Sequence, residues 1–209
     1  MDRAFADRFV ALRQSLASFV RGKAAANGPE APMLAEAEAG IAGLEPPAER
    51  DEPLRLPGCR HLPAALATAK QGPLGEVAAA FEALEPDMRW VQTEHYRKTL
   101  GDDHMANYAY TNLVGWRGLV PHQRIAAGFV IIGPGRHYPD HHHEAEEVYV
   151  PFCGDTLWGQ DGGEPMPREP GSTIHHPPWR CHAMTTRGTP LFALYLWRGP
   201  VLQMAQLVA

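Results

Sequence analysis

Residues 135–154 read GRHYPDHHHEAEEVYVPFCG and decide how the rest of the chain is interpreted. Three consecutive histidines and several acids lead into EEVYVPFC, a run rich in Val, Tyr and Phe that is typical of a β-strand. Histidine, glutamate and tyrosine side chains crowd together when they share one ligand. The stretch therefore predicts a strand that carries a binding site.

Alternation along an extended strand sorts these side chains onto two faces. His142 and Glu146 fall on one face, which we expect to be the solvent side. The other face carries the residues of odd number, and these are the candidate site residues: His141, His143, Glu147 and Tyr149.

Neutral imidazole and carboxylate ligands suit one divalent transition metal ion, such as Zn, Fe or Mn. A fourth ligand must come from elsewhere, and HHPPWRCHAM at residues 175–184 offers His175, His176 and His182. We favour His182, because it lies where a strand at 180–184 would enter a barrel. A histidine-rich storage tract is disfavoured, because the first stretch interleaves its histidines with strand-forming residues.

The first half of the chain carries helical patterns, with apolar residues at steps of three and four. They form two stripes: Phe5, Phe9, Leu12, Leu16, Val20 and Leu74, Val77, Phe81, Leu84. Between them, the Pro-rich and acidic residues 44–58 predict an exposed connection. From about residue 120, short β-rich segments alternate with Gly and Pro, as in an antiparallel barrel or jelly roll.

These patterns predict a mainly β protein with an α-helical extension. We expect a helical region over residues 1–110, packed on a β-barrel formed by residues 111–209. A long extension beside an open pocket is also placed to cap the mouth of the barrel.

Composition narrows the partners and the compartment. Nineteen basic and twenty-four acidic residues give a net charge of −5 with no basic cluster, so nucleic acid is an unsuitable partner. The charged N-terminus does not resemble a secretory signal, and no apolar run is long enough to span a membrane. Three cysteines without a CxxC pair favour the reducing cytosol. A homodimer is left open.

The spacing within residues 135–154 resembles the first cupin motif without a gap: Gly, five residues, His-x-His, three residues, Glu, six residues and Gly. The segment HHPPWRCHAM resembles the second motif, although its usual proline-x-glycine is only approximated and a later asparagine is absent. The resemblance implies a cupin barrel with His141, His143, Glu147 and His182 on the metal.

Further details resemble one group of cupins, the bacterial dimethylsulfoniopropionate lyases of the DddQ and DddL type. These details are a tyrosine two residues after the glutamate, a tyrosine five residues before the second histidine, a helical extension, and a tryptophan on the last barrel strand. The resemblance implies a carbon–sulfur lyase that cleaves dimethylsulfoniopropionate to dimethyl sulfide and acrylate.

Such a reaction needs a metal on the substrate carboxylate and a base at the α-carbon. Tyr149 fits the base, because a nearby cation lowers the pKa of a phenol. The sulfonium group requires aromatic faces, for which Tyr138, Trp197 and Tyr195 are the candidates. The same metal ligands also serve cupin dioxygenases, and a non-catalytic small-molecule-binding cupin is the alternative from another class.

Overall fold

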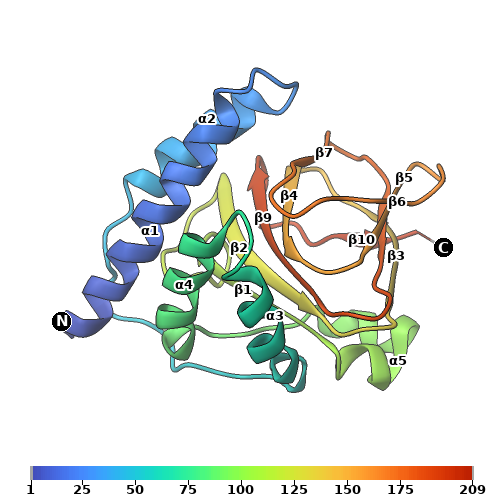
Figure 1. The fold of residues 1–209 in the computed structure, drawn as a ribbon, viewed down its shortest axis with the longest axis horizontal. Coiled ribbons are helices and arrows are strands. Elements are labelled where there is room, and N and C mark those ends of the chain that lie inside the picture. Colours follow the sequence, from blue (N-terminus) through green and yellow to red (C-terminus); the bar gives the residue numbers. More distant parts are fainter. Residues whose placement is uncertain (1, 209) are drawn as a thin grey trace.

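The structure is a computed structural model that describes residues 2–208, with most of its helices on one side and a β-barrel on the other (Figure 1). In the described residues the helices are α1 (Arg3–Ala24), α2 (Ala31–Ala42), η1 (Pro57–His61), α3 (Leu62–Ala69), α4 (Gly75–Leu84), η2 (Glu85–Asp87), η3 (Glu94–Tyr96) and α5 (Arg97–Met105). The strands are β1 (Tyr108–Val114), β2 (Ile125–Ile132), β3 (His137–His142), β4 (Glu146–Cys153), β5 (Leu157–Gln160), β6 (Met166–Pro167), β7 (Ile174–His176), β8 (His182–Thr185), β9 (Leu191–Arg198) and β10 (Gln206–Leu207).

The strands form two antiparallel sheets, with the orders β1-β2-β9-β4-β7 and β10-β3-β8-β5-β6. The chain passes repeatedly from one sheet to the other, so that β3 and β4, which are neighbours in sequence, lie in different sheets. Together the sheets enclose the barrel on the right of Figure 1. The fold is a cupin barrel with a helical extension, as the sequence predicts.

The sheet that contains β2 and β9 is buried on both faces, which explains its continuous apolar runs. Along β2, Phe129 and Ile131 belong to the core shared with the helices, whereas Val130 and Ile132 belong to the core inside the barrel. The helices cover the outer face. In that layer the Phe81 ring of α4 lies 4.3 Å from the ring of Phe129.

Both helical stripes are confirmed. Helix α1 begins where Asp2 Oδ1 accepts hydrogen bonds from the backbone N–H groups of Ala4 and Phe5, the usual arrangement at a helix N-terminus. The five apolar residues of its stripe are fully buried. Residues 44–56 form no helix, as their prolines predict.

The first strand begins earlier than we expected. Strand β1 starts at Tyr108, and Tyr110 exchanges two backbone hydrogen bonds with Val91. Its sequence, YAYTNLV, alternates aromatic and small residues but lacks the Gly and Pro punctuation that marks the later strands. Punctuation was therefore an incomplete guide to where strands begin.

The three cysteines are free thiols; Cys59 and Cys153 are buried and Cys181 is half-buried. Over the described residues, no helix has the length and apolar character that crossing a membrane requires.

Candidate active site

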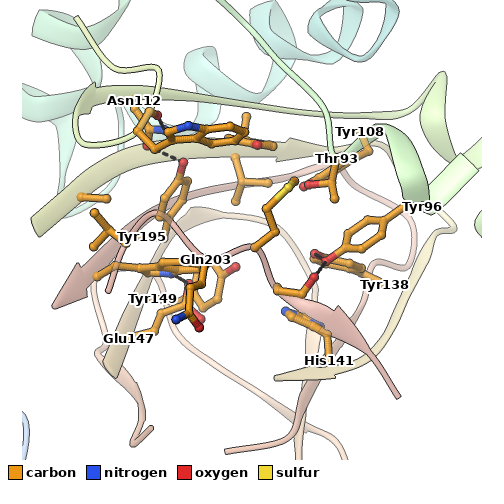
Figure 2. A pocket seen from close by; sticks show the side chains of 18 residues that line it. Thr93, Tyr96, Tyr108, Asn112, Tyr138, His141, Glu147, Tyr149, Tyr195 and Gln203 are labelled. Carbon is orange, nitrogen blue, oxygen red and sulfur yellow. Dashed lines mark hydrogen bonds between the residues drawn. The ribbon is translucent and has the colours of Figure 1, made fainter. Parts of the chain in front are cut away.

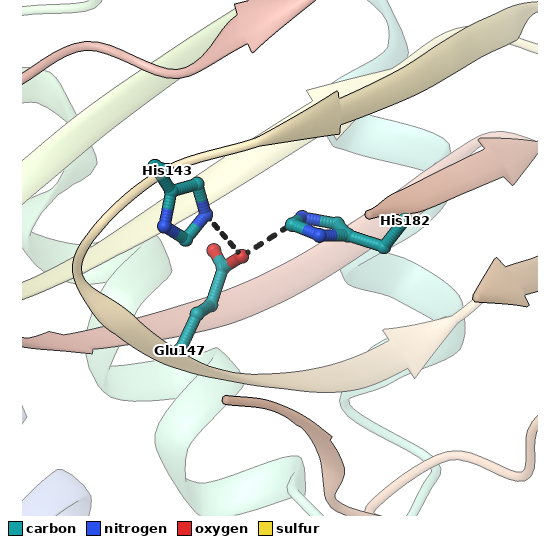
Figure 3. A group of neighbouring side chains, drawn as sticks. All are labelled: His143, Glu147 and His182. Carbon is teal, nitrogen blue, oxygen red and sulfur yellow. Dashed lines mark hydrogen bonds and ion pairs between the residues drawn. The ribbon is translucent and has the colours of Figure 1, made fainter. Parts of the chain in front are cut away.

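Three side chains meet inside the barrel: His143, Glu147 and His182 (Figure 3). Glu147 Oε2 lies 3.0 Å from His143 Nε2 and 3.1 Å from His182 Nε2. All three side chains are buried, and the carboxylate has no exposed surface. This is a compact set of two nitrogens and one oxygen.

We expected a single extended strand to carry these residues, and that prediction is wrong. The first motif is divided between β3 and β4, and His143 lies in the turn that joins them. Glu147 therefore reaches the site from one sheet, and His141 and His182 from the other. Residues of equal parity still point inward, because each strand separately alternates between the barrel interior and the outside.

The histidine tautomers follow from backbone contacts. The Nδ1 atoms of His141, His143 and His182 each lie 2.8–2.9 Å from a backbone carbonyl oxygen. A carbonyl only accepts hydrogen bonds, so each Nδ1 carries the proton and donates it. In the neutral ring, which carries a single N–H, each Nε2 atom then keeps its lone pair, and this is the form that ligates a metal.

This donor set fits a divalent cation. Two Nε2 lone pairs face one carboxylate oxygen, and His182 Nε2 is buried without a hydrogen-bond partner among the described residues. Burial alone would raise the pKa of Glu147, but His143 and His182 outweigh it and hold that pKa well below its usual value. The site is therefore anionic and rich in lone pairs, as metal ligation requires.

His141 stands beside this group. It is the direct cross-strand partner of His182, and the two ring centroids are 4.0 Å apart. Burial lowers the pKa of His141 well below its usual value, so this ring stays neutral. The structure thus brings three of the four predicted ligands within 4.8 Å of one another and leaves His141 adjacent to them.

The outward-facing residues have other partners. Glu146 pairs with Arg198 and with His175 Nε2, which lies 2.9 Å from Glu146 Oε1. His142 is half-buried, and its ring meets the ring of Trp179 edge to face. Both predicted solvent-side residues therefore lie outside the barrel, although neither is fully exposed.

The turn between β7 and β8, inside the second motif, contacts the first motif. Trp179 has a φ of 66°, in the left-handed region that glycine adopts without strain, and it occupies the position of the missing motif glycine. Its backbone N–H donates to the carbonyl oxygen of His143 at 2.8 Å. The backbone at this position therefore has a conformation that suits glycine, although a tryptophan occupies it.

One cavity opens onto the site, with an empty volume of about 660 Å³ (Figure 2). All six tyrosines of the chain line it, together with Trp116 and Trp197. Glu147 and His141 line it too, whereas none of the described residues in its wall is Lys or Arg. The cavity is aromatic and, apart from Glu147, uncharged.

The tyrosine hydroxyls are largely bonded to one another and to the wall. Tyr138 donates to Tyr96 at 3.2 Å, Tyr96 donates to the carbonyl oxygen of Ala205 at 3.0 Å, and Tyr195 donates to Asn112 at 2.5 Å. Burial raises the pKa of Tyr96 to about 12 and raises those of Tyr138 and Tyr195 well above the usual value. These rings therefore stay neutral.

The ring of Tyr195 needs a glycine beside it. Gly128 on β2 lies opposite both Asn112 and Tyr195, and a β-carbon there would overlap the side chains of both. The glycine makes room for the hydrogen bond that holds the Tyr195 ring in the cavity wall.

Tyr149 lies in the cavity wall next to Glu147, as the sequence predicts. In the polypeptide alone, burial, followed by the negative charge of Glu147, raises the pKa of Tyr149 well above its usual value. The lowered pKa that we expect requires a neighbouring cation, whose charge would oppose that of Glu147.

Trp197 and Tyr195 on β9 and Tyr138 on β3 all line the cavity. Trp197 Nε1 donates to Glu147 Oε1 at 2.6 Å, so this ring also orients the carboxylate. Several residues of the cavity wall were not predicted from the sequence. Alternation in YAYTNLV could have indicated Tyr108 and Tyr110, whereas nothing local indicates Thr93, Tyr96 or residues 201–205.

The expected capping of the mouth is wrong for most of the helical region. Helices α2 and α3 contact the outer face of the barrel, against β2, β4 and β9. Within residues 2–105, only Thr93 and Tyr96 reach the cavity. The C-terminal segment contributes more of the cavity wall, through Val201, Gln203, Met204 and Ala205.

Comparison with known proteins extends these observations. The family model for dimethylsulfoniopropionate lyase matches residues 37–193. The lyase DddQ of Ruegeria pomeroyi is 35% identical over 120 residues, which cover 57% of this chain and 59% of that protein. A Cereibacter sphaeroides protein named as a candidate lyase, DddL, is 29% identical over 156 residues, which cover 73% of this chain and 64% of that protein.

The matched regions thus span less than two thirds of either relative. A crystal structure of the lyase DddQ from Ruegeria pomeroyi superposes with a TM-score of 0.70 at 28% identity, covering 100% of this chain and 98% of that one. The family match covers most of the chain and includes both histidine motifs, at residues 135–154 and 175–184. The chain belongs to the dimethylsulfoniopropionate lyase family.

Proposed function

We propose that this protein is a metal-dependent lyase that cleaves dimethylsulfoniopropionate to dimethyl sulfide and acrylate. The observation that carries the proposal is a buried His/Glu ligand group at one end of a cavity lined by all six tyrosines. Family membership supports the same substrate class.

The charges of the cavity match this zwitterion. Its aromatic faces suit a sulfonium cation, which has no hydrogen-bond donors and is held by π electrons. A carboxylate would find no Lys or Arg among the described wall residues. A divalent ion on His143, Glu147 and His182, with His141 as the fourth ligand, would polarise that carboxylate and offset the charge of Glu147 beside Tyr149.

The residues of the chain then have distinct roles. Tyr138, Tyr195 and Trp197 hold the sulfonium end against their rings. Tyr149 would act as a phenolate, which the bound cation would stabilise, and its oxygen accepts the proton from the α-carbon to give the neutral phenol. The electron pair of that C–H bond forms the new C=C bond, and the β-carbon–sulfur bond breaks with its pair leaving on sulfur, so that dimethyl sulfide and acrylate are the products.

The test is direct. Purified protein is stripped with a chelator, reloaded separately with Zn, Fe or Mn, and mixed with dimethylsulfoniopropionate under argon. We expect equal amounts of dimethyl sulfide and acrylate from at least one loaded form and neither from the stripped form. Because elimination consumes no dioxygen, a reaction that required air would support an oxygenase, and no dimethyl sulfide with any metal would refute the proposal.

Cellular location and assembly stay predictions. Free thiols at Cys59, Cys153 and Cys181 agree with a reducing cytosol. Sedimentation velocity would distinguish a monomer from a homodimer.

A further inference from the structure

His176 has a buried imidazole next to the metal-ligand group, and the proposed chemistry assigns no role to it. It lies on β7 directly opposite Glu147 on β4, so both side chains project into the barrel. Its exposed fraction is 1%. Its ring stacks on that of His182, with a centroid separation of 3.9 Å and an interplanar angle of 15°.

Gln160 determines which nitrogen of His176 carries the proton. The amide nitrogen of Gln160 lies 2.9 Å from the carbonyl oxygen of His175 and 2.8 Å from His176 Nδ1. The carbonyl can only accept, which identifies the amide atom as the donor. His176 Nδ1 therefore accepts, and in the neutral ring Nε2 carries the proton.

This tautomer is the opposite of that in His141, His143 and His182. Their Nδ1 atoms donate to backbone carbonyls and leave Nε2 free to ligate. A protonated Nε2 has no lone pair to offer, so His176 stands outside the ligand set despite its contact with His182. Its Nε2 is buried and has no hydrogen-bond partner among the described residues.

Gln160, His176 and His182 contact one another, and His182 is the proposed metal ligand among them. Gln160 is the direct cross-strand partner of His182, bonds to His176, and so links the ring that stacks on His182 to the strand beside it. The Nδ1 of His182 is held by the carbonyl oxygen of Arg180 at 2.8 Å. This one hydrogen bond limits the rotation of the ring about its bond to Cβ, and the stack with His176 restricts the tilt of the ring plane further.

We propose that His176 is a positioning residue of the metal site, fixed by Gln160, whose flat ring holds the plane of His182 without ligating the metal. The inference rests on the proposed metal site. On this proposal His176 acts by stacking on His182 and does not serve as a fifth metal ligand.

The first experiment compares His176→Phe, which keeps a flat ring, with His176→Leu, which fills the space without one. Cobalt is loaded into each purified full-length chain, and its affinity is measured by chelator competition together with its d–d absorption spectrum. We expect the Phe variant to keep the wild-type band positions and an affinity within about threefold, and the Leu variant to lose about 10- to 100-fold in affinity with shifted bands.

A matched control is His175→Leu, because His175 is the preceding residue of β7 and points outward to Glu146. It should keep wild-type cobalt affinity. Thermal unfolding of each apoprotein separates loss of positioning from loss of folding, since a fold defect lowers the midpoint in both His176 variants. Loss of cobalt in the Phe variant as complete as in His182→Ala would make His176 a ligand and overturn the proposal, and so would wild-type affinity and spectrum in the Leu variant.

The second experiment reads the tautomers directly from long-range ¹H–¹⁵N correlation spectra of the histidine rings. We expect the proton on Nε2 in His176 and on Nδ1 in His182. A proton on Nδ1 of His176 would overturn the assignment. Failure of the wild-type chain to bind any metal would instead refute the proposed function, so the two failures are distinguishable.

Discussion

The Glu147 carboxylate contacts several side chains of the site at once. Its Oε2 faces two imidazole nitrogens, and its Oε1 accepts a hydrogen bond from Trp197. A completely buried carboxylate is costly unless it is paired or bound to a metal. The surrounding contacts supply that compensation, and they also place the negative charge beside Tyr149, where a general base would have to act.

Replacement of His143 or His182 with alanine should remove most of the bound metal and nearly all activity. Each variant loses one nitrogen of a three-membered group and leaves Glu147 with one fewer partner. His142→Ala is the matched control, because His142 lies between the motif histidines but outside the barrel and should keep its metal. Metal content by mass spectrometry checks this, and full occupancy in both site variants would contradict the ligand assignment.

Tyr149→Phe should leave metal content and substrate affinity largely unchanged while lowering kcat by roughly 10²-fold or more, the scale of a lost general base. The ring stays in the cavity wall and only the oxygen is removed. Steady-state kinetics with ordinary and α-deuterated substrate checks the role, since a primary isotope effect indicates rate-limiting proton removal. A kcat near that of the wild type would exclude Tyr149 and make Tyr138 the next phenol to test.

The turn between β7 and β8 shows how an element can persist after its usual residue is lost. Trp179 is half-exposed, at 52%, so little packing holds it in a left-handed conformation that costs an L-residue about 1–2 kcal/mol. The backbone contact to His143 and the strands on either side impose that conformation. The backbone strain at Trp179 therefore lies in the turn that leads into β8, the strand that begins at His182.

Trp179→Gly should accordingly be more stable than Trp179→Ala by about 1 kcal/mol, because only glycine adopts the left-handed region without strain. Both variants lose the same contact with the ring of His142, so the difference isolates the backbone. Chemical denaturation of the two variants measures it. Equal stability would mean that the turn relaxes to a different conformation when the tryptophan is removed.

At the scale of the whole molecule, the helices and the barrel share one hydrophobic core. The outer face of the β2–β9 sheet carries Phe129 and Phe192, and both rings contact Phe81 of α4. The core inside the barrel is separate and contains the tyrosines of the cavity. One sheet therefore serves two functions, with its outer face stabilising the helical layer and its inner face forming the site.

A shortened chain that begins at Asn107, just before β1, should be poorly soluble and should aggregate. Its outer sheet face would become a large exposed apolar patch, although every predicted metal ligand would remain. Size-exclusion chromatography and cobalt titration of the refolded chain check this expectation. A monodisperse barrel with wild-type metal affinity would show that the helical layer is dispensable for the site.

The sequence alone was sufficient to predict the helical stripes, the barrel and the inward residues of the histidine motif. These follow from short-range periodicity, such as the three- and four-residue spacing in α1 and the alternation in EEVYV. It could not predict that β3 and β4 belong to opposite sheets, because strand pairing depends on contacts between residues far apart in the chain. Odd residue numbers indicated the inward side chains correctly, because side chains alternate within β3 and within β4, although the two strands do not form one continuous strand.

Only the tertiary structure decided the environment of each site residue. The pKa of Tyr149 depends on its burial and on the charge of Glu147, and sequence spacing does not specify either. Tyr96 reaches the cavity through a 3-10 helix, and its hydroxyl bonds to Ala205, 109 residues later. The sequence offers His176 beside His182 and favours His182 only because it lies where a strand would enter the barrel. The hydrogen bond from Gln160 to His176 Nδ1 is a contact that exists only after β5 and β7 have been brought together around His182.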